Sequence, residues 1–318
     1  MILSFAPMEG VSSAVFRRVH RRFFPEADRY YAPFIAPDGR GTFKSSRLRD
    51  LLPESNPGVS LIPQLLTNQS ESFLGAARQI ADLGYREINL NLGCPSATVV
   101  SKHKGSGMLR ERERLDGFLA DVFSRSPVAV SVKTRLGFFS PDEIDALMEI
   151  YNRYPIRELI IHARHREGYY QSPVDLEAFS RAIDCAGMPV IYNGNVFTAA
   201  DYRAVKERFP ALSGVMLGRG AAADPALFRV IRGGEPLRLD ELRAFHAALS
   251  DELLASGLSP AYAAARLKEL WFYLRALFPD DERLCRALFK SRDLTELLSR
   301  AEDLFSRGAF DPAPGFRG

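Results

Sequence analysis

One cysteine of this chain stands in a setting that favours chemistry. Cys94 lies between Gly93 and Pro95, a sequence typical of a turn, and a turn presents a side chain rather than burying it. A thiol with an ordinary pKa of about 8.5 is mostly protonated at neutral pH, so it can deliver a proton to a developing carbanion. An exposed thiol can also be a nucleophile, but the sequence shows no paired base that would activate it.

The other two cysteines carry no comparable signal. Cys185 falls within an apolar helical pattern, and we expect Cys185 and Cys285 to be small side chains of the core. The three cysteines are far apart and odd in number, which gives neither a disulfide framework nor the paired spacing of a zinc site. We therefore expect no metal, and any cysteine chemistry would use a single thiol.

Lys133 and His162 each end an apolar β-type run. A lysine in that position would not point inward without an anionic partner. A flavin ring meets that need, because a reduced flavin carries negative charge near N1 and O2 that a fixed ammonium stabilises. His162 by itself is compatible with two interpretations, a hydrogen-bonded histidine at the rim or a group of the site, and its position opposite Lys133 makes the second equally plausible.

Two glycine-rich turns follow the next two β-type runs. Gly194 lies between Asn193 and Asn195, and Arg219 lies between Gly218 and Gly220. Bare backbone amides in such turns bind phosphate, although glycines also serve simply to make tight turns. The second turn fits a dinucleotide fingerprint of the G-x-G-x-x-A kind, but no strand follows to complete a βαβ unit, so we discount that interpretation.

The elements that must position these residues alternate regularly. Eight short apolar runs predict strands at Ile2–Ala6, Tyr30–Ile35, Ser60–Leu66, Glu87–Asn91, Val128–Lys133, Glu158–His162, Pro189–Asn193 and Gly214–Gly218. Amphipathic patterns between them predict helices at Ser70–Leu83, Arg110–Ser124, Pro141–Tyr151, Val174–Ala186 and Ala199–Phe209. Such alternation indicates an α/β fold of the (β/α)8 TIM-barrel type, in which the loops after the strands form one shared site.

Beyond residue 234 no further β-type run appears, and the remaining chain is helical in pattern. We predict a catalytic barrel over residues 1–236 and a smaller all-helical domain over residues 237–318, with helix breaks near Gly257–Pro260 and Phe278–Asp281. The composition, 46% hydrophobic and 25% charged over 318 residues, is that of a globular chain. No apolar run reaches the roughly 18 residues that a membrane helix needs, so we expect a cytoplasmic protein, and we expect a monomer.

Six short motifs of this chain, in this order and spacing, resemble those of the tRNA-dihydrouridine synthases, and the likeness runs over most of residues 1–230. The motif from Asn89 to Ser96, in which asparagines precede Gly93-Cys94-Pro95, is the most specific. The others begin at Ala6, Val132, Ile161, Asn193 and Gly218.

The resemblance implies a barrel that binds FMN and reduces the C5=C6 bond of a specific uridine in tRNA, with NADPH as reductant. Cys94 would be the catalytic proton donor, and Asn91 and Tyr170 would contact the target nucleotide. Residues matching the cofactor site are Pro7, Met8, Glu9, Gln64, Lys133, His162, Asn193, Gly194, Asn195, Gly218 and Arg219. Asn195 stands where an acidic residue is frequent in the family, and residues 37–57, where only 46–52 could be a short helix, match nothing that we can place.

RNA binding then requires cations. Lys268, Phe272 and Arg275 share one face of a predicted helix that looks like the helix with which such enzymes hold tRNA. Basic clusters at residues 17–22 and 102–104 add modest support, although each is more often a solvated face. Trp271 on the same helix is expected in the core rather than in a stacking surface.

Three other functions stay open on the sequence. An FMN barrel of this kind could reduce a free pyrimidine or a small enone, although the helical domain argues against that substrate class. The chain could also be a catalytically silent tRNA-binding protein, which the presence of Cys94, Lys133 and His162 disfavours. The third is a flavin-free phosphosugar lyase or isomerase. The colour of the purified protein distinguishes it from a flavin enzyme, because bound flavin is yellow.

Overall fold

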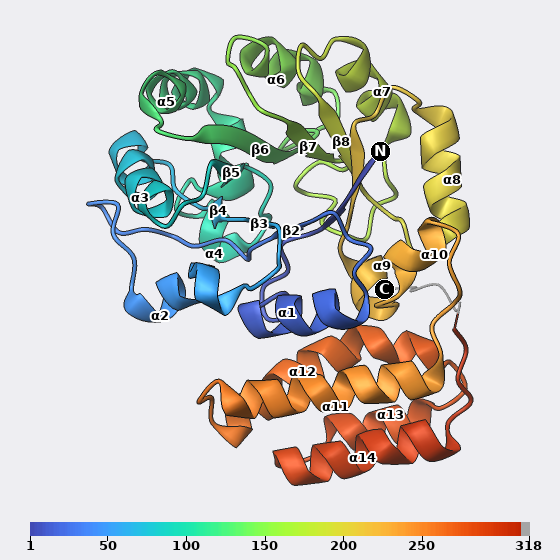
Figure 1. Ribbon diagram of the computed structural model, residues 1–318. Helices are drawn as coiled ribbons and strands as arrows, with labels where there is room; N and C mark the ends of the chain where they lie inside the picture. Colours follow the sequence, from blue (N-terminus) through green and yellow to red (C-terminus); the bar gives the residue numbers. More distant parts are fainter. Residues whose placement is uncertain (313–318) are drawn as a thin grey trace.

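A computed structural model describes residues 1–312, so the last six residues of the predicted helical domain lie outside the described part. Its centre is one parallel sheet in the order β3-β2-β1-β9-β8-β7-β6-β5-β4, curved into a barrel (Figure 1). The described strands are β1 Ile2–Phe5, β2 Arg29–Tyr31, β3 Leu61–Ile62, β4 Gln64–Leu65, β5 Glu87–Asn91, β6 Ala129–Arg135, β7 Leu159–His162, β8 Val190–Asn193 and β9 Gly214–Leu217. The predicted α/β barrel is confirmed.

The third predicted strand is interrupted. Residues 60–66 form two short strands, because Pro63 between them has no N–H to donate to a ladder. β3 pairs with β2 and β4 pairs with β5, so the chain itself crosses the seam of the barrel at Pro63. Ile35 forms an isolated parallel bridge to Leu65 beside this seam, where we had predicted a continuation of the second strand.

The strands bury side chains on both faces, which explains their nearly continuous apolar sequences. A small cluster, whose members come from alternate positions, fills the inside of the barrel: Ala6, Tyr31, Ile62, Ile160, Ile191 and Met216. The larger apolar core lies between the strands and the surrounding helices.

Helices follow the strands as the periodicity predicts, and their ends match local capping signals. Thr198 and Asp201 form a capping box at the start of α8, and Asp175 accepts from the Ala178 amide at the start of α7. The helices around the barrel are α1 Ala14–Phe23, α3 Ser70–Asp82, α4 Ala97–Val100, α5 Arg112–Arg125, α6 Glu143–Tyr151, α7 Leu176–Asp184, α8 Ala199–Arg208, α9 Arg219–Ala223 and α10 Leu227–Ile231. A 3₁₀ segment, η3 Gly105–Arg110, precedes α5.

The irregular segment 37–57 contains three short helical turns where one short helix was predicted. These are α2 Ser45–Leu48, η1 Arg49–Leu51 and η2 Pro53–Ser55. The segment leaves the carboxyl end of β2 and therefore lies at the same rim of the barrel as the loops that follow the other strands.

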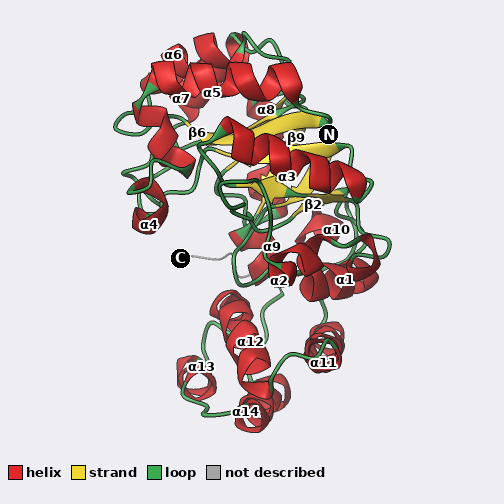
Figure 2. Cartoon of the chain, turned by 90° about the vertical axis from the view of Figure 1, so that its left-hand side faces the viewer, coloured by secondary structure: helices red, strands yellow, loops and turns green. Residues whose placement is uncertain are grey.

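The C-terminal helices form a separate layer beside α1 and α9, below the barrel in Figures 1 and 2. They are α11 Leu239–Ala255, α12 Pro260–Leu274, η4 Arg275–Leu277, α13 Glu282–Phe289 and α14 Leu294–Arg307, with breaks where the sequence predicts them. Trp271 is buried as expected, and its Nε1 donates to Nε2 of His246 over 2.9 Å. Phe245 of α11 packs against Phe16 and Phe24, which attaches this layer to the barrel.

Two sequence predictions about side chains are wrong. The basic run 17–22 is not an RNA-facing patch, because Arg17 is buried and Arg18 and Arg22 both pair with Glu252 of α11. Cys185 is exposed at the end of α7 rather than part of the core, since the pattern continues past the point where the helix ends. Cys285 is buried as expected.

Within residues 1–312, no helix combines the length and the apolar character needed to cross a membrane. The described histidine, cysteine and acidic side chains form no cluster that could hold a metal ion.

Candidate active site

A cavity of about 510 Å³ opens at the carboxyl ends of the strands. Loops after nearly every strand contribute to its wall, as expected for a barrel of this type. Phe272 and Tyr273 of α12 also line it, so the C-terminal helices close one side. The predicted site residues that line the cavity are Pro7, Met8, Glu9, Gln64, Asn91, Cys94, Lys133, His162, Tyr170, Asn193, Gly194, Gly218 and Arg219.

Lys133 projects from β6 into this cavity. Its Nζ donates to Oδ1 of Asn193 over 2.9 Å, and Nδ2 of Asn193 donates to the carbonyl oxygen of Met216 over 2.9 Å. Burial and the neighbouring Arg135 guanidinium lower the pKa of Lys133 to about 7. An amide oxygen carries no net charge, so the ammonium still lacks the anionic partner that a buried lysine requires.

His162 sits in a group of cations. Nε2 of His162 is 3.0 Å from Nη1 of Arg164, and since a guanidinium donates and cannot accept, the imidazole is neutral with its proton on Nδ1. Burial, together with Arg135, Lys133, Arg164 and Arg219, holds the pKa of His162 well below its usual value. The histidine is therefore suited to donate a hydrogen bond from Nδ1, and not to act as a charged acid.

Asn195 does not line the cavity. Its Oδ1 accepts from Nη2 of Arg164 over 3.0 Å and from Nη2 of Arg219 over 2.9 Å, so it holds two guanidinium groups side by side. Cofactor contact by Asn195 stays a prediction. In the structure its side chain holds Arg219, and Arg219 lines the cavity.

Cys94 lies in the loop after β5, and that loop is fixed through Asn91. Oδ1 of Asn91 accepts from the amides of Gly93 and Cys94 over 3.1 and 2.9 Å, while its Nδ2 donates to Oε1 of Gln64 over 2.8 Å. Burial raises the pKa of the Cys94 thiol, so the thiol keeps its proton at neutral pH. The side chain is half-buried and lines the cavity wall.

Tyr170 stands on the opposite loop, after β7, with its ring half exposed. The ring centroid lies 4.9 Å from the Arg219 guanidinium carbon and 5.6 Å from that of Arg135. The His162 ring lies 5.6 Å away. Arg135 connects the two loops, because its Nε donates to the carbonyl of Gly93 over 2.8 Å and its Nη1 to that of Tyr169 over 3.1 Å.

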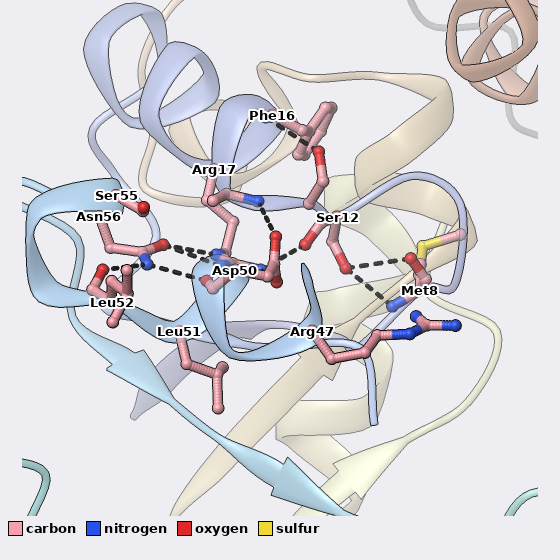
Figure 3. Close-up of polar contacts among 12 residues, drawn as sticks. Met8, Ser12, Phe16, Arg17, Arg47, Asp50, Leu51, Leu52, Ser55 and Asn56 are labelled. Carbon is pink, nitrogen blue, oxygen red and sulfur yellow. Dashed lines mark hydrogen bonds and ion pairs between the residues drawn. The ribbon is translucent and has the colours of Figure 1, made fainter. Parts of the chain in front are cut away.

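A buried arginine, Arg17, fixes the turn after β1 through hydrogen bonds (Figure 3). Nη1 of Arg17 donates to the carbonyl of Ser12 over 2.6 Å, and Oγ of Ser12 accepts from the Met8 amide over 2.8 Å. The same arginine donates to Oδ2 of Asp50 over 3.1 Å and to Oδ1 of Asn56 over 2.8 Å. The segment that had no assignment in the sequence is thereby attached to a turn that lines the cavity.

The cavity fits an anionic cofactor. Lys133, His162 and Arg219 face it with Arg135, and among its described lining residues the one carboxylate, Glu9, is more than half exposed at the rim and pairs with Arg47. Gly194 is required in the wall, because a Cβ there would lie 2.2 Å from the Tyr192 hydroxyl. Basic side chains without a described acidic partner inside the cavity, beside a neutral histidine and a glycine in the wall, suit a group that carries phosphate and an electron-accepting ring.

Sequence reasoning missed several residues of the site. Arg135 and Arg164 each follow a predicted site residue at two positions further on, so the period of a strand could have placed them on the same side as Lys133 and His162. Tyr273 gave no such signal, and Phe272, which was predicted on the RNA-binding face of this helix, also lines the cavity. The contact of α12 with the cavity was not predictable, because it depends on packing between distant parts of the chain. Lys268 and Arg275 lie outside the cavity. Nζ of Lys268 donates to the carbonyl of Ser291, and the Arg275 guanidinium lies 4.6 Å from the Phe272 ring centroid.

Comparison with known proteins identifies the class. The family model for dihydrouridine synthases matches residues 4–253, and the chain belongs to the dihydrouridine synthase family. It is therefore an enzyme, and the resemblance stated from the sequence is confirmed.

Three relatives that align over nearly the whole chain share one name. A tRNA-dihydrouridine(16) synthase of Ralstonia nicotianae is 30% identical, and the alignment covers 98% of each chain. A protein of the same name from Pseudomonas putida is 29% identical over 93% of this chain and 95% of that one. Another, from Aquipseudomonas alcaligenes, is 27% identical over 92% of this chain and 96% of that one.

Solved structures support the fold. A variant of NCR from Zymomonas mobilis has a TM-score of 0.53 at 12% identity and covers 74% of this chain and 87% of its own. Morphinone reductase has a TM-score of 0.52 at 11% identity, covering 76% of this chain and 88% of its own.

Proposed function

We propose that this enzyme reduces the C5=C6 bond of a uridine in tRNA to dihydrouridine, with FMN as the bound cofactor and NADPH as reductant. The single observation that carries the proposal is the convergence of a protonated Cys94 thiol with Lys133, His162 and Arg219 in one cavity. Membership in the dihydrouridine synthase family supplies the reaction. FMN bound in that cavity would supply the chemistry of accepting a hydride from NADPH and delivering one to the uracil ring.

Residues of the barrel would hold the cofactor. Lys133 and, through Nδ1, the neutral His162 could each donate a hydrogen bond to an acceptor atom of the ring. Arg219, fixed by Asn195, would face the phosphate together with the backbone of the glycine turns. The remaining contacts would come from Pro7, Met8, Glu9, Gln64, Asn193, Gly194 and Gly218.

Cys94 would hold the proton that the reaction needs at C5. A proton donor must lie on the face of the base away from the cofactor for addition to opposite faces, and the loop after β5 stands over the cavity from one side. Asn91 fixes the cysteine backbone, and Tyr170 would stack on the extruded base. Arg135 would hold the two loops at a constant separation.

The RNA would lie across the cavity mouth and the C-terminal helices. Arg275 and Phe272 of this layer stay part of the proposed RNA contact, while Lys268 donates to the Ser291 carbonyl just beyond α13. We retain residues 1–236 as the catalytic unit and 237–318 as the tRNA-binding unit. Relatives that cover nearly the whole chain are named for position 16, so we propose uridine 16 as the target.

Mass mapping of dihydrouridine in tRNA from cells with and without this gene tests the proposal. We expect dihydrouridine at position 16 to disappear when the gene is deleted and to return when the wild-type gene is restored. Restoration with the Cys94→Ala gene provides the matched control, since the fold should survive that change. An unchanged dihydrouridine map in the deletion strain would overturn the proposal.

A further inference from the structure

A rigid loop after β6 presents an aromatic ring to solvent. Phe139 is 56% exposed, yet its backbone is fixed, because the Glu143 carboxylate accepts from the amides of Phe138, Phe139 and Ser140 over 2.8, 3.0 and 3.2 Å. Gly137 starts the loop, and a Cβ there would lie 2.1 Å from the carbonyl oxygen of Ser140. The loop therefore holds the Phe139 ring at the surface in a fixed place.

Arginines alternate with aromatic rings along this part of the rim. The Arg110 guanidinium carbon lies 5.1 Å from the Phe138 ring centroid and 5.7 Å from that of Phe139. The Arg166 guanidinium carbon lies 5.2 Å from the Phe138 centroid and 5.0 Å from that of Tyr169. We call Arg110, Phe138, Phe139, Arg166 and Tyr169 the rim ladder. Its members come from the connections after three neighbouring strands, β5, β6 and β7.

The rim ladder leads directly into the cavity. Tyr169 is followed in the chain by Tyr170, whose ring lines the cavity between Arg135 and Arg219. Tyr169 has a positive φ of 44°, a conformation that is strained for a non-glycine residue, and its carbonyl accepts from Nη1 of Arg135.

The two arginines of the rim ladder contact rings of the protein but no carboxylate of residues 1–312. Neither Arg110 nor Arg166 forms an ion pair with any residue in the described part of the chain. Nε of Arg166 is buried and has no hydrogen-bond partner among the described residues. Phe138 is buried, but Phe139 and Tyr169 are exposed. Two guanidinium groups that pair with no described carboxylate, beside two exposed rings, are a combination that binds single-stranded nucleic acid, with rings for bases and cations for phosphates.

We propose that the rim ladder binds the unpaired nucleotides that flank the target uridine. This inference rests on the proposed function, since a target base that enters the cavity brings the nucleotides on either side of it to the rim. Phe139 and Tyr169 take bases by stacking, and Arg110 and Arg166 hold the connecting phosphates. The C-terminal helices lie on another side of the cavity, at Phe272 and Tyr273, so the rim ladder is a second RNA contact.

The test compares Phe139→Leu with Phe139→Trp. Leucine keeps an apolar group of similar size and loses the ring face, whereas tryptophan keeps stacking. We expect Phe139→Leu to weaken binding of a fluorescent single-stranded oligouridylate by about tenfold and Phe139→Trp to bind as tightly as the wild type or more tightly. Arg110→Gln should flatten the salt dependence of that binding by about one unit of log-log slope.

Arg208→Gln is the matched control, because Arg208 also lies over an aromatic ring, 5.4 Å from the Phe209 centroid, but stands on the outer helix α8. It should leave binding unchanged. Equal oligouridylate affinity in Phe139→Leu and wild type would overturn the proposal. So would an equal loss for a blunt RNA duplex, or binding of oligoglutamate as tight as that of oligouridylate.

The same proteins separate this inference from the proposed function. Wild-type protein that binds oligouridylate through the rim ladder but forms no dihydrouridine in tRNA would refute the function and leave the ladder in place. If wild-type protein forms dihydrouridine and Phe139→Leu binds oligouridylate normally, the proposed function stands and the rim ladder is refuted. Cofactor content should be equal in all variants, which shows that each is folded.

Discussion

Lys133 and Asn193 stand on β6 and β8, two strands apart in the sheet, and the lysine ammonium donates to the asparagine amide oxygen over 2.9 Å. Asn193 is itself oriented by the carbonyl of Met216. The contact therefore fixes where the ammonium lies without neutralising it. With burial and Arg135 both acting against the charge, the pKa of Lys133 falls to about 7.

Flavin affinity of the apoprotein should consequently depend on pH. A ligand that accepts a hydrogen bond from the ammonium favours its charged form, so binding above pH 7 takes up a proton and the affinity falls as pH rises. For one group the limit is about tenfold per pH unit. Riboflavin is the right probe, because it lacks the phosphate that titrates in the same range, and fluorescence quenching between pH 6 and 9 measures its affinity.

The matched variants are Lys133→Gln, which still donates but does not titrate, and Lys206→Gln on the exposed side of α8. Lys133→Gln should bind riboflavin more weakly at pH 6 and with little pH dependence, whereas Lys206→Gln should behave as wild type. A Lys133→Gln protein with the wild-type pH profile would remove Lys133 from the flavin site.

The C-terminal helices should lose stability in mild acid. His246 is buried and accepts from Trp271, and burial lowers its pKa to about 4. Because the pKa in the unfolded chain is about 6.5, the unfolded state binds more protons between these values. The stabilisation is therefore complete above pH 6.5 and falls by about 1.4 kcal/mol per unit as the pH drops toward 4.

Fluorescence of Trp271, the one tryptophan of the sequence, reports unfolding of these helices in urea. His246→Gln keeps an acceptor for the indole and removes the titration, so its unfolding midpoint should change less between pH 7.5 and 5 than that of the wild type. His103→Gln is the control, since His103 is exposed. Equal pH dependence in His246→Gln and wild type would assign the acid sensitivity to other groups, such as the buried His20, whose pKa burial lowers to about 3.

Replacing Arg17 should reduce the stability of the fold more than replacing an exposed arginine. Arg17→Met leaves Asp50, Asn56 and the Ser12 carbonyl without their shared donor, and breaking a buried pair of this kind costs about 3–5 kcal/mol. Arg22→Met removes an exposed pair with Glu252 and should cost about 1 kcal/mol or less. Calorimetric unfolding compares the two. Similar losses would show that segment 37–57 is not held by Arg17.

The sequence predicts the barrel because each strand is a short apolar run closed by turn residues, and that pattern depends on neighbours in the chain. It does not predict the break at Pro63, since residues 60–66 look continuous when the pairing of each half with a different strand is unknown. Arg17 is the clearest miss. A run of cations normally marks a solvated face, and its burial depends on Asp50 and Asn56, more than thirty positions away.

In the candidate site, too, the sequence predicts some residues and not others. Cys94, Lys133 and His162 were predictable because each ends or follows a strand, and the ends of parallel strands meet at one rim. The Arg164–Asn195–Arg219 contact was not, because hydrogen bonds between loops of different strands leave no local signal. Phe139 gave no signal either, since an exposed phenylalanine and a buried one look alike in sequence.

Reoxidation of reduced Cys94→Ala protein by tRNA tests the central claim most directly. Stopped-flow absorbance should show that NADPH reduces the variant at the wild-type rate, since the thiol takes no part in that half-reaction. Transfer to tRNA should then be about 10²- to 10⁴-fold slower, the usual cost of losing a positioned acid. Cys94→Ser should recover little of the rate, because a hydroxyl is a much weaker acid than a thiol. Reoxidation of Cys94→Ala by tRNA at the wild-type rate would contradict the account.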